Sequence, residues 1–256
     1  MGKLDCLVIS DGSLIVPPPP GAAPDTMGEE MEVLSLLIDN GRQKVLIDTG
    51  CGEKFTGTDT GKLVMNLKAA GISCDEVEVI VFTHGHIDHC AGTFDKNGKA
   101  VFPRARYITA RTEWKCWVDK KERKELQMIF GPARQDLLPI PEQFHLAEEG
   151  EEILPGIILT TAPGHTPGSA ILKIHSDGQN ITCVGDLVHS AREFDKPDYY
   201  SFLDVDPALA IESRNRIFSD LARSGEMAFV CHFPFPGLGH MVKKDGRWVW
   251  KQATQG

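Results

Sequence analysis

The chain has 256 residues, enough to bury a substantial core in one large domain or two small ones. Its 41% apolar and 25% charged residues are typical of a soluble globular protein, and a net charge of −9 argues against a nucleic-acid partner. No segment reaches the roughly 18 apolar residues of a membrane span, and the N-terminal apolar run is too short for a signal peptide. Seven cysteines without CxxC spacing indicate reduced thiols. We therefore expect a cytoplasmic protein without membrane contact.

Short apolar runs bounded by turn residues alternate with segments of helical periodicity along the chain. The predicted strands are residues 4–10, 33–38, 44–47, 77–82, 106–109, 156–161, 171–174, 181–184, 227–231 and 247–251. The predicted helices are residues 61–70, 111–117 and 207–222, the last with Asp206 as N-cap and proline at its first position. Residues 120–146 are irregular and are expected to form an insertion or a lid-like connection.

The N-terminal part carries three local signals. The first strand is expected to end at the turn Asp11-Gly12. The tract of residues 17–20 is all proline, which favours either a surface linker or the rim of an active-site mouth. Asp48 ends the strand of residues 44–47 beside a glycine turn. Its carboxylate is expected to orient a metal ligand, or else to stabilise the turn.

The segment THGHIDH, residues 83–89, directly follows a run of β-branched residues that predicts a buried strand. Imidazole and carboxylate groups are ligands for zinc, and also for iron or manganese. A loop at a strand end can direct several such groups to one point while the sheet holds them. One short loop could therefore serve two adjacent cations, with His84 and His86 on one and Asp88 and His89 on the other.

Three later positions, each at the end of a predicted strand, supply further ligands. His165 lies in APGHTPGS, residues 162–169, where glycines and prolines fix the backbone around the ring. Asp186 directly follows an apolar strand, and its carboxylate can bridge two cations and reduce their repulsion. His232 also follows a strand directly, and for that reason we prefer it to His240 as a ligand.

The other histidines lack such a position. His145, His175 and His189 are expected on the surface or in hydrogen bonds, with His189 near enough to Asp186 to support it. Cys90 is expected to be a small buried apolar residue rather than a ligand.

Aromatic residues near the predicted site leave alternatives open. Tyr199 or Tyr200 could donate a hydrogen bond to a leaving group, line a pocket or lie on the surface. Phe233 and Phe235 either line an apolar pocket or pack in the core.

The ordered set LIDTG, THGHIDH, PGHTPGS, GD and a late histidine resembles the metallo-β-lactamase superfamily over nearly the whole chain. The resemblance implies an α/β (α+β) fold, a four-layer αββα sandwich of two mixed β-sheets flanked by helices, in a single domain of residues 1–256. It also implies two metals: one held by His84, His86 and His165, the other by Asp88, His89 and His232, and a bridge formed by Asp186.

Departures from the family pattern narrow the expected branch. Asp186 stands where β-lactamases usually carry cysteine or serine, which disfavours antibiotic hydrolysis. The Asp11-Gly12 turn, the step Ser213-Arg214 in the last helix and the segment HFPFPGLG, residues 232–239, are similar to a branch of quorum-quenching N-acyl-homoserine lactonases and methyl parathion hydrolases.

The implied activity is hydrolysis of a small lactone or related ester by a hydroxide shared between two divalent cations, with organophosphate hydrolysis as a side activity. Asp88 and Asp186 are the expected catalytic residues, Asp88 as the group that accepts or relays the proton. Zinc is the expected metal, with iron, manganese or cobalt as alternatives, and a homodimer is left open. A glyoxalase II-like thioesterase and an iron-dependent oxidoreductase on the same fold remain alternative functions.

Overall fold

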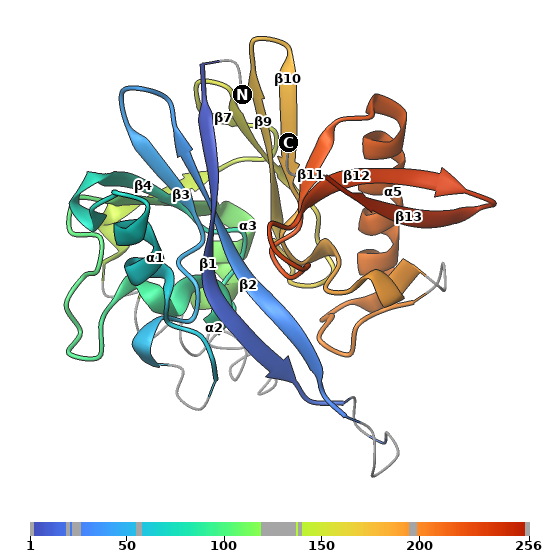
Figure 1. Cartoon of the computed structure of the whole chain (residues 1–256), viewed down its shortest axis with the longest axis horizontal. Helices are drawn as coiled ribbons and strands as arrows, with labels where there is room; N and C mark the ends of the chain where they lie inside the picture. Colours follow the sequence, from blue (N-terminus) through green and yellow to red (C-terminus); the bar gives the residue numbers. More distant parts are fainter. Residues whose placement is uncertain are drawn as a thin grey trace.

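The computed structural model describes residues 3–18, 21, 27–54, 58–118, 137, 140–194 and 199–253. Within them, two mixed β-sheets of six and seven strands face each other and carry helices on their outer sides (Figure 1). This arrangement confirms the predicted αββα sandwich.

The six-stranded sheet has the spatial order of the sequence: β1 (Asp5–Val16), β2 (Glu29–Asp39), β3 (Lys44–Ile47), β4 (Val77–Val81), β5 (Arg106–Ala110) and β6 (Phe144–Ala147). The seven-stranded sheet runs in the order β13 (Arg247–Gln252), β12 (Leu238–Lys244), β11 (Met227–Phe229), β10 (Gln179–Cys183), β9 (Ala170–Ser176), β8 (Ile157–Thr161) and β7 (Glu152–Leu154). The described helices are α1 (Leu63–Ala69), α2 (Ile87–Cys90), α3 (Arg111–Val118) and α5 (Pro207–Ser224).

Three apolar layers hold these elements together. Between the sheets, side chains such as Leu36 and Val81 of the first sheet share a buried cluster with Leu172 and Phe229 of the second. A second cluster joins α1 and α3 to the outer face of the first sheet, and a third joins α5 to the outer face of the second. Because both faces of the central strands are buried, their ends are held rigidly enough to position functional side chains.

Most predicted elements are confirmed, and the first strand is the clearest correction. β1 does not end at Asp11-Gly12 but continues to Val16 through a bulge at that point. The bulge turns the fully buried Asp11 carboxylate inward, where it accepts the backbone N–H groups of Cys51 and Leu63, both at 2.9 Å. Gly12 has a φ of 114°, and a Cβ there would lie 1.8 Å from the backbone oxygen of Asp59. Asp11-Gly12, which the sequence predicts as a turn, therefore forms a bulge in close contact with the backbone of Asp59.

Several short strands were missed. β7 has only three residues and β6 only four, and β6 lies largely within the segment expected to be irregular. A third missed strand, β12, is longer and begins at Leu238, at the end of the segment HFPFPGLG. Short strands contain too few residues for a clear alternation of apolar and polar side chains. Whether such a segment forms a strand therefore depends on the neighbouring strand with which it pairs. The remainder of the predicted insertion, apart from residues 137 and 140–146, lies outside the described residues.

Helix α5 begins as predicted. The Asp206 side chain accepts the N–H of Leu209 at 3.1 Å, proline occupies the first turn, and Gly225 ends the helix with a φ of 69°.

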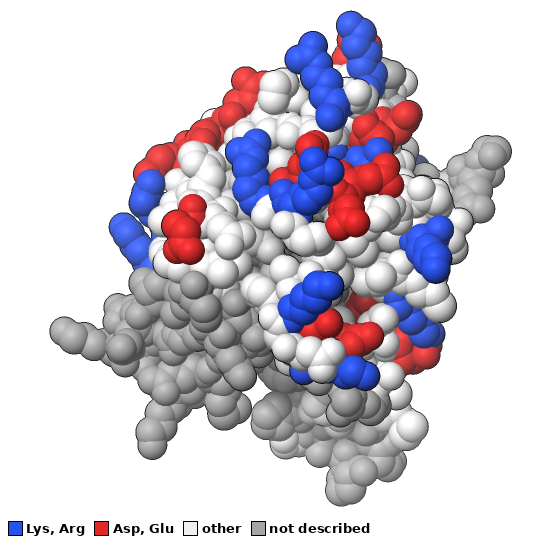
Figure 2. All heavy atoms as spheres, turned by 90° about the vertical axis from the view of Figure 1, so that its left-hand side faces the viewer, with Lys and Arg blue, Asp and Glu red and all other residues white. Residues whose placement is uncertain are grey.

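Across the described part of the chain, no helix is long and apolar enough to cross a membrane. On the face shown in Figure 2, acidic and basic side chains are interspersed rather than separated by sign.

Candidate metal centre

The THGHIDH segment leaves the end of β4 and enters the short helix α2. His84 is fully buried, whereas His86 and Asp88 keep part of their surface accessible. The Thr83 hydroxyl donates to Asp48 at 2.8 Å, so its oxygen is free to accept the Nδ1–H of His84 at 3.1 Å. The lone pair of a neutral His84 therefore lies on Nε2, which faces the other predicted ligands.

Asp48 reaches this loop because β3 and β4 are parallel neighbours and end side by side. One carboxylate oxygen accepts the Thr83 backbone N–H at 2.8 Å, and the other accepts the His89 Nδ1–H at 2.8 Å. The expected contact between Asp48 and a predicted ligand is confirmed. The contact fixes the ring of His89 with its Nε2 turned toward the centre of the cluster.

The three later positions come from the second sheet. His165 follows β8 and donates its Nδ1–H to Asp204 at 3.2 Å. His232 follows β11 and donates its Nδ1–H to the Glu32 carbonyl at 2.7 Å. Asp186 lies directly beyond β10 and is 5% exposed. In each histidine the bonded Nδ1 leaves Nε2 as the inward-facing atom.

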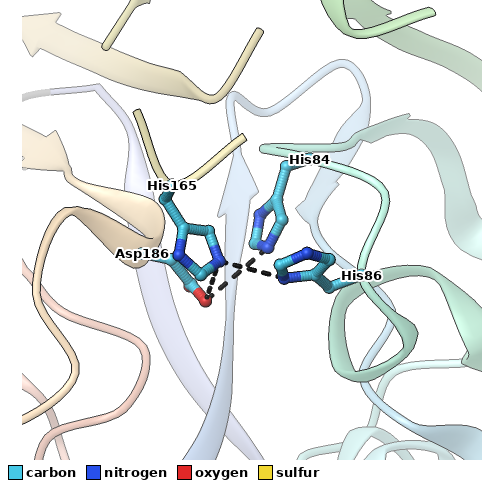
Figure 3. Close-up of side chains that lie close together, drawn as sticks. All are labelled: His84, His86, His165 and Asp186. Carbon is cyan, nitrogen blue, oxygen red and sulfur yellow. Dashed lines mark hydrogen bonds and ion pairs between the residues drawn. The ribbon is translucent and has the colours of Figure 1, made fainter. Parts of the chain in front are cut away.

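Asp186 occupies the middle of the cluster, and its two oxygens face different neighbours. Oδ2 lies 3.2 Å from His165 Nε2 and 3.6 Å from His84 Nε2 (Figure 3). Oδ1 lies 3.1 Å from His89 Nε2 and 3.2 Å from His232 Nε2. One carboxylate is therefore shared by two groups of donor atoms.

The two groups match the spacing of ligand atoms around a cation. The first consists of His84, His86, His165 and Asp186, with His165 Nε2 and His86 Nδ1 2.9 Å apart. In the second, Asp88 Oδ2 lies 3.7 Å from both His89 Nε2 and His232 Nε2. Ligands bound at about 2.0–2.2 Å in tetrahedral geometry are separated by distances of this size. All seven predicted ligands are thus brought together.

Cys231 also belongs to the second group, and no pattern in the sequence predicts this position. Its thiol, 3% exposed, donates to Asp186 Oδ1 at 3.4 Å. All seven cysteines are free, and Cys90 is fully buried as expected.

Burial and charge shift the pKa values of the cluster in different directions. Burial lowers the pKa of His89 and of His165, but the neighbouring carboxylates, above all Asp186, more than offset it and raise both. Burial and the neighbouring His89 hold the pKa of His84 well below its ordinary value, so this ring offers a lone pair. Burial would raise the pKa of Asp186, but the surrounding histidines hold it well below its ordinary value. The buried Nε2 atoms of His84, His89 and His232 make no hydrogen bond. Buried polar atoms without partners are costly, and a bound cation is the partner this donor set lacks.

His189 is closer to the centre than the sequence suggested. It is 5% exposed, its Nε2 lies 3.4 Å from Asp186 Oδ2, and its Nδ1 donates to Glu193 at 3.2 Å. Glu193 in turn pairs with the buried Arg214 of α5 at 3.2 Å. The Nε2 of His189 has no hydrogen-bond partner. Its position three residues after Asp186 was the only signal in the sequence.

The remaining candidates lie apart from the cluster. His240 is in β12 and bonds the Gly225 carbonyl at 3.1 Å, and His145 pairs with Glu151. His175 is exposed on β9. Of the aromatic residues, Phe233 is buried in the layer under α5, whereas Phe235 is 49% exposed.

Two neighbouring cavities open beside the cluster, with volumes of about 490 and 250 Å³. His189, Met31 and Phe202 line both, and Tyr199 lines the smaller one. At the polar end of the larger cavity are His86, Asp88, Asp186 and His189, and its other walls are largely apolar. Lysine and arginine are absent from the described residues that line either cavity. Pro17 and Pro18 also line the smaller cavity, which favours the rim interpretation for these two residues, whereas residues 19–20 lie outside the described part of the chain.

A dense His/Asp cluster at the strand ends of an αββα sandwich, beside an open cavity, defines the class of a metal-dependent hydrolase. Residues 28–232 match the family model of the metallo-β-lactamase superfamily, and the chain belongs to that family.

The similar proteins include lactonases, a hydrolase and a ribonuclease of Thermus thermophilus. N-acyl homoserine lactonase AiiA of Bacillus thuringiensis subsp. kurstaki is 25% identical over 221 residues, which cover 79% of this chain and 81% of the relative. AidC, a dizinc quorum-quenching lactonase solved in complex with a product, superposes with a TM-score of 0.90 at 26% identity, covering 100% of this chain and 96% of AidC. The hydrolase AbOPH superposes with a TM-score of 0.88 at 27% identity and the same coverage.

Replacing Asp48 by asparagine is expected to weaken metal binding by about 10–100-fold, the usual effect of losing a group that orients a ligand. The amide keeps the size of the carboxylate and tolerates the positive φ of 59° at this position. Its NH₂ group must, however, face the N–H of either Thr83 or His89. The measurement is metal affinity by chelator competition. Asp245→Asn, at an exposed turn with a φ of 50°, is the matched control, and equal affinities in the two variants would contradict the role of Asp48.

Proposed function

We propose that this chain is a dinuclear metal-dependent hydrolase that opens lactones or cleaves related esters, in the manner of an N-acyl-homoserine lactonase. The observation that carries the proposal is the position of Asp186. Its two oxygens face two separate groups of donor atoms beside a largely apolar cavity. The similarity to AidC and AiiA supports the same conclusion.

We infer the following ligands from the two groups of inward-facing atoms. One cation would be held by His84, His86 and His165, the other by Asp88, His89 and His232, with Asp186 between them. The ligands come from both sheets, so the site is complete only when the two sheets are packed together.

When bound, the cations would act as Lewis acids and lower the pKa of a water molecule to near 7. Asp88 and His189 then have separate tasks. The Asp88 carboxylate lines the larger cavity and can accept the proton that the nucleophile gives up. His189 lines both cavities, and its Nε2 makes no hydrogen bond although Asp186 Oδ2 lies 3.4 Å away, so we infer that a polar atom of the substrate supplies the missing partner. We propose that His189, in preference to Tyr199 or Tyr200, makes this hydrogen bond.

The cavities favour an uncharged substrate with an apolar arm. Apolar side chains form most of the larger cavity, including Leu14, Met31 and Phe202. A substrate that carries carboxylates, such as a glutathione thioester, would need cationic partners, and the described lining supplies none. The glyoxalase II-like alternative is therefore less well supported. A neutral phosphotriester meets the same requirement as a lactone, so organophosphate hydrolysis stays a prediction.

The test is metal content combined with hydrolysis of a panel of acyl-homoserine lactones, aryl esters, glutathione thioesters and methyl paraoxon. About two metals per chain and a preference for lactones would support the proposal. One iron per chain without hydrolysis of any compound would contradict it and favour the oxidoreductase alternative. The same metal analysis decides between zinc, iron, manganese and cobalt. The cytoplasmic location, the homodimer and the single domain of residues 1–256 stay predictions.

Substituting tryptophan for Met31 is expected to raise KM for long-chain lactones about tenfold, while short-chain lactones change little. Met31 is 6% exposed and lines both cavities, so the larger side chain would occupy space needed by the apolar arm. The measurement is kcat and KM for a series of acyl lengths. Met65→Trp, at a 60% exposed position on α1, is the control. A uniform change in KM across all acyl lengths would show that the acyl arm does not bind beside Met31.

A further inference from the structure

Glu113 is a fully buried carboxylate in the first turn of α3, and the mechanism above does not use it. We propose that Glu113 is a positioning residue that fixes the two loops carrying His84, His86 and His165. The inference rests on the proposed metal centre and deepens it, because it concerns how one of the two cation sites is assembled.

Four donors converge on this one carboxylate. Oε1 accepts the backbone N–H of Gly85 at 3.0 Å and the indole N–H of Trp117 at 3.3 Å. Oε2 accepts the hydroxyl of Thr166 at 2.8 Å and the backbone N–H of Gly168 at 3.0 Å. The partners Gly85 and Thr166 are direct chain neighbours of predicted ligands in two different loops.

The two loops belong to different sheets, so neither sheet by itself fixes the position of one loop relative to the other. Gly85 lies between His84 and His86, beyond β4 of the first sheet, whereas His165 follows β8 of the second. His86 Nδ1 and His165 Nε2 are nevertheless 2.9 Å apart. Glu113 contacts both loops directly, and each of its oxygens is assigned to one loop. A shift of the first loop would therefore break the bond from Gly85, and a shift of the second would break the bonds from Thr166 and Gly168.

Gly168 shows that the contact between α3 and the His165 loop is close. A Cβ on Gly168 would lie 2.1 Å from the backbone nitrogen of Glu113 and 2.5 Å from its Cα. Only glycine permits the loop to approach the start of α3 so closely. The second cation group is held by other partners, since Asp48 orients His89 and the Glu32 carbonyl orients His232. Loss of Glu113 is therefore expected to affect one group selectively.

Charge is as important as shape at this position. All four partners are donors, and an ionised carboxylate can accept from all of them. Burial raises the pKa of Glu113, and the hydrogen bonds from Thr166 and Gly85 oppose that rise. Glutamine has the same size, but its NH₂ group must face the donors of one loop. Glu113→Gln therefore removes one half of the contact without creating a cavity.

The experiment compares the wild-type chain with Glu113→Gln and with the control Asp11→Asn. Asp11 is also fully buried and accepts backbone N–H groups, but at Cys51 and Leu63, outside the loops of the first group. Metal per chain, stepwise affinity by chelator competition and the visible spectrum of the cobalt-loaded protein are measured, together with thermal unfolding. For Glu113→Gln we expect one of the two metals to bind about 10–100-fold more weakly and the other to be unchanged. For Asp11→Asn we expect a loss of thermal stability with both affinities retained.

If Glu113→Gln does not fold, Thr166→Val serves instead, because it removes a single donor and leaves the carboxylate in place. Its expected effect has the same direction and is smaller. Unchanged affinities in whichever variant folds, or an equal weakening of both metals, would overturn the role of Glu113. A wild-type chain without metal would refute the proposed function and this inference together, whereas two metals bound with unchanged affinities in every variant would refute the inference alone.

Discussion

Asp186→Asn is expected to lower kcat/KM for any hydrolysed substrate by about 10³-fold, because both proposed cation sites lose the negative charge of the carboxylate that they share. The two oxygens of Asp186 lie between 3.1 and 3.6 Å from the Nε2 atoms of four predicted ligands. Asparagine keeps the shape but carries no charge, and its NH₂ group would point at lone pairs on one side or the other. Metal content is expected to fall below two per chain.

The measurement combines steady-state kinetics with metal analysis of the purified protein. Asp177→Asn is the matched control, because it makes the same chemical change at an exposed position with a φ of 47°. Two metals per chain and near-normal activity in Asp186→Asn would show that the bridge is not needed, and the proposed centre would have to be abandoned.

His189→Leu is expected to lower kcat/KM by about 10²-fold while both metals stay bound, a typical cost of losing one preorganised hydrogen bond at a reacting group. His189 is not among the seven predicted ligands, yet it lines both cavities and its Nε2 makes no hydrogen bond. The effect should fall on kcat if His189 bonds the reacting oxygens, and on KM if it bonds another part of the substrate. His189→Gln, which can still form a hydrogen bond, should retain part of the activity.

His175→Leu, at an exposed position on β9, is the control for this series. Full activity of His189→Leu would exclude a direct contact between His189 and the substrate. Tyr199, which lines the smaller cavity, would then be the candidate for the hydrogen bond to the substrate. Loss of metal from His189→Leu would instead place His189 among the ligands. Either result can be read from kinetics and metal content measured on the same preparation.

The seven predicted ligands could be identified from the sequence because each follows a strand or lies in a short loop at a strand end. His84, His86, Asp88 and His89 occupy one seven-residue segment, so their proximity is a local property. His165 lies among glycines and prolines that restrict the backbone to a specific conformation, and Asp186 and His232 directly follow apolar runs. Such signals depend on a few neighbouring residues and can be recognised without knowledge of the fold.

Glu113, Cys231 and His189 could not be assigned in the same way. Glu113 lies in the first turn of an ordinary amphipathic helix, and its contacts with Gly85 and Thr166 span 28 and 53 residues. The sequence contains no local pattern that distinguishes it from an exposed glutamate. The same holds for the Cys231 thiol, which meets Asp186 only because β10 and β11 are parallel neighbours.

The sequence by itself determined the kind of chemistry, because the donor atoms and their spacing follow from local residue types at strand ends. The tertiary structure decided which donor atoms surround each oxygen of Asp186, which groups hold the rings, and where the largely apolar cavity lies. Those properties depend on the alignment of two sheets across a shared core, and that alignment is the sum of many distant apolar contacts. No segment of the chain encodes it alone, so it becomes visible only in the folded protein.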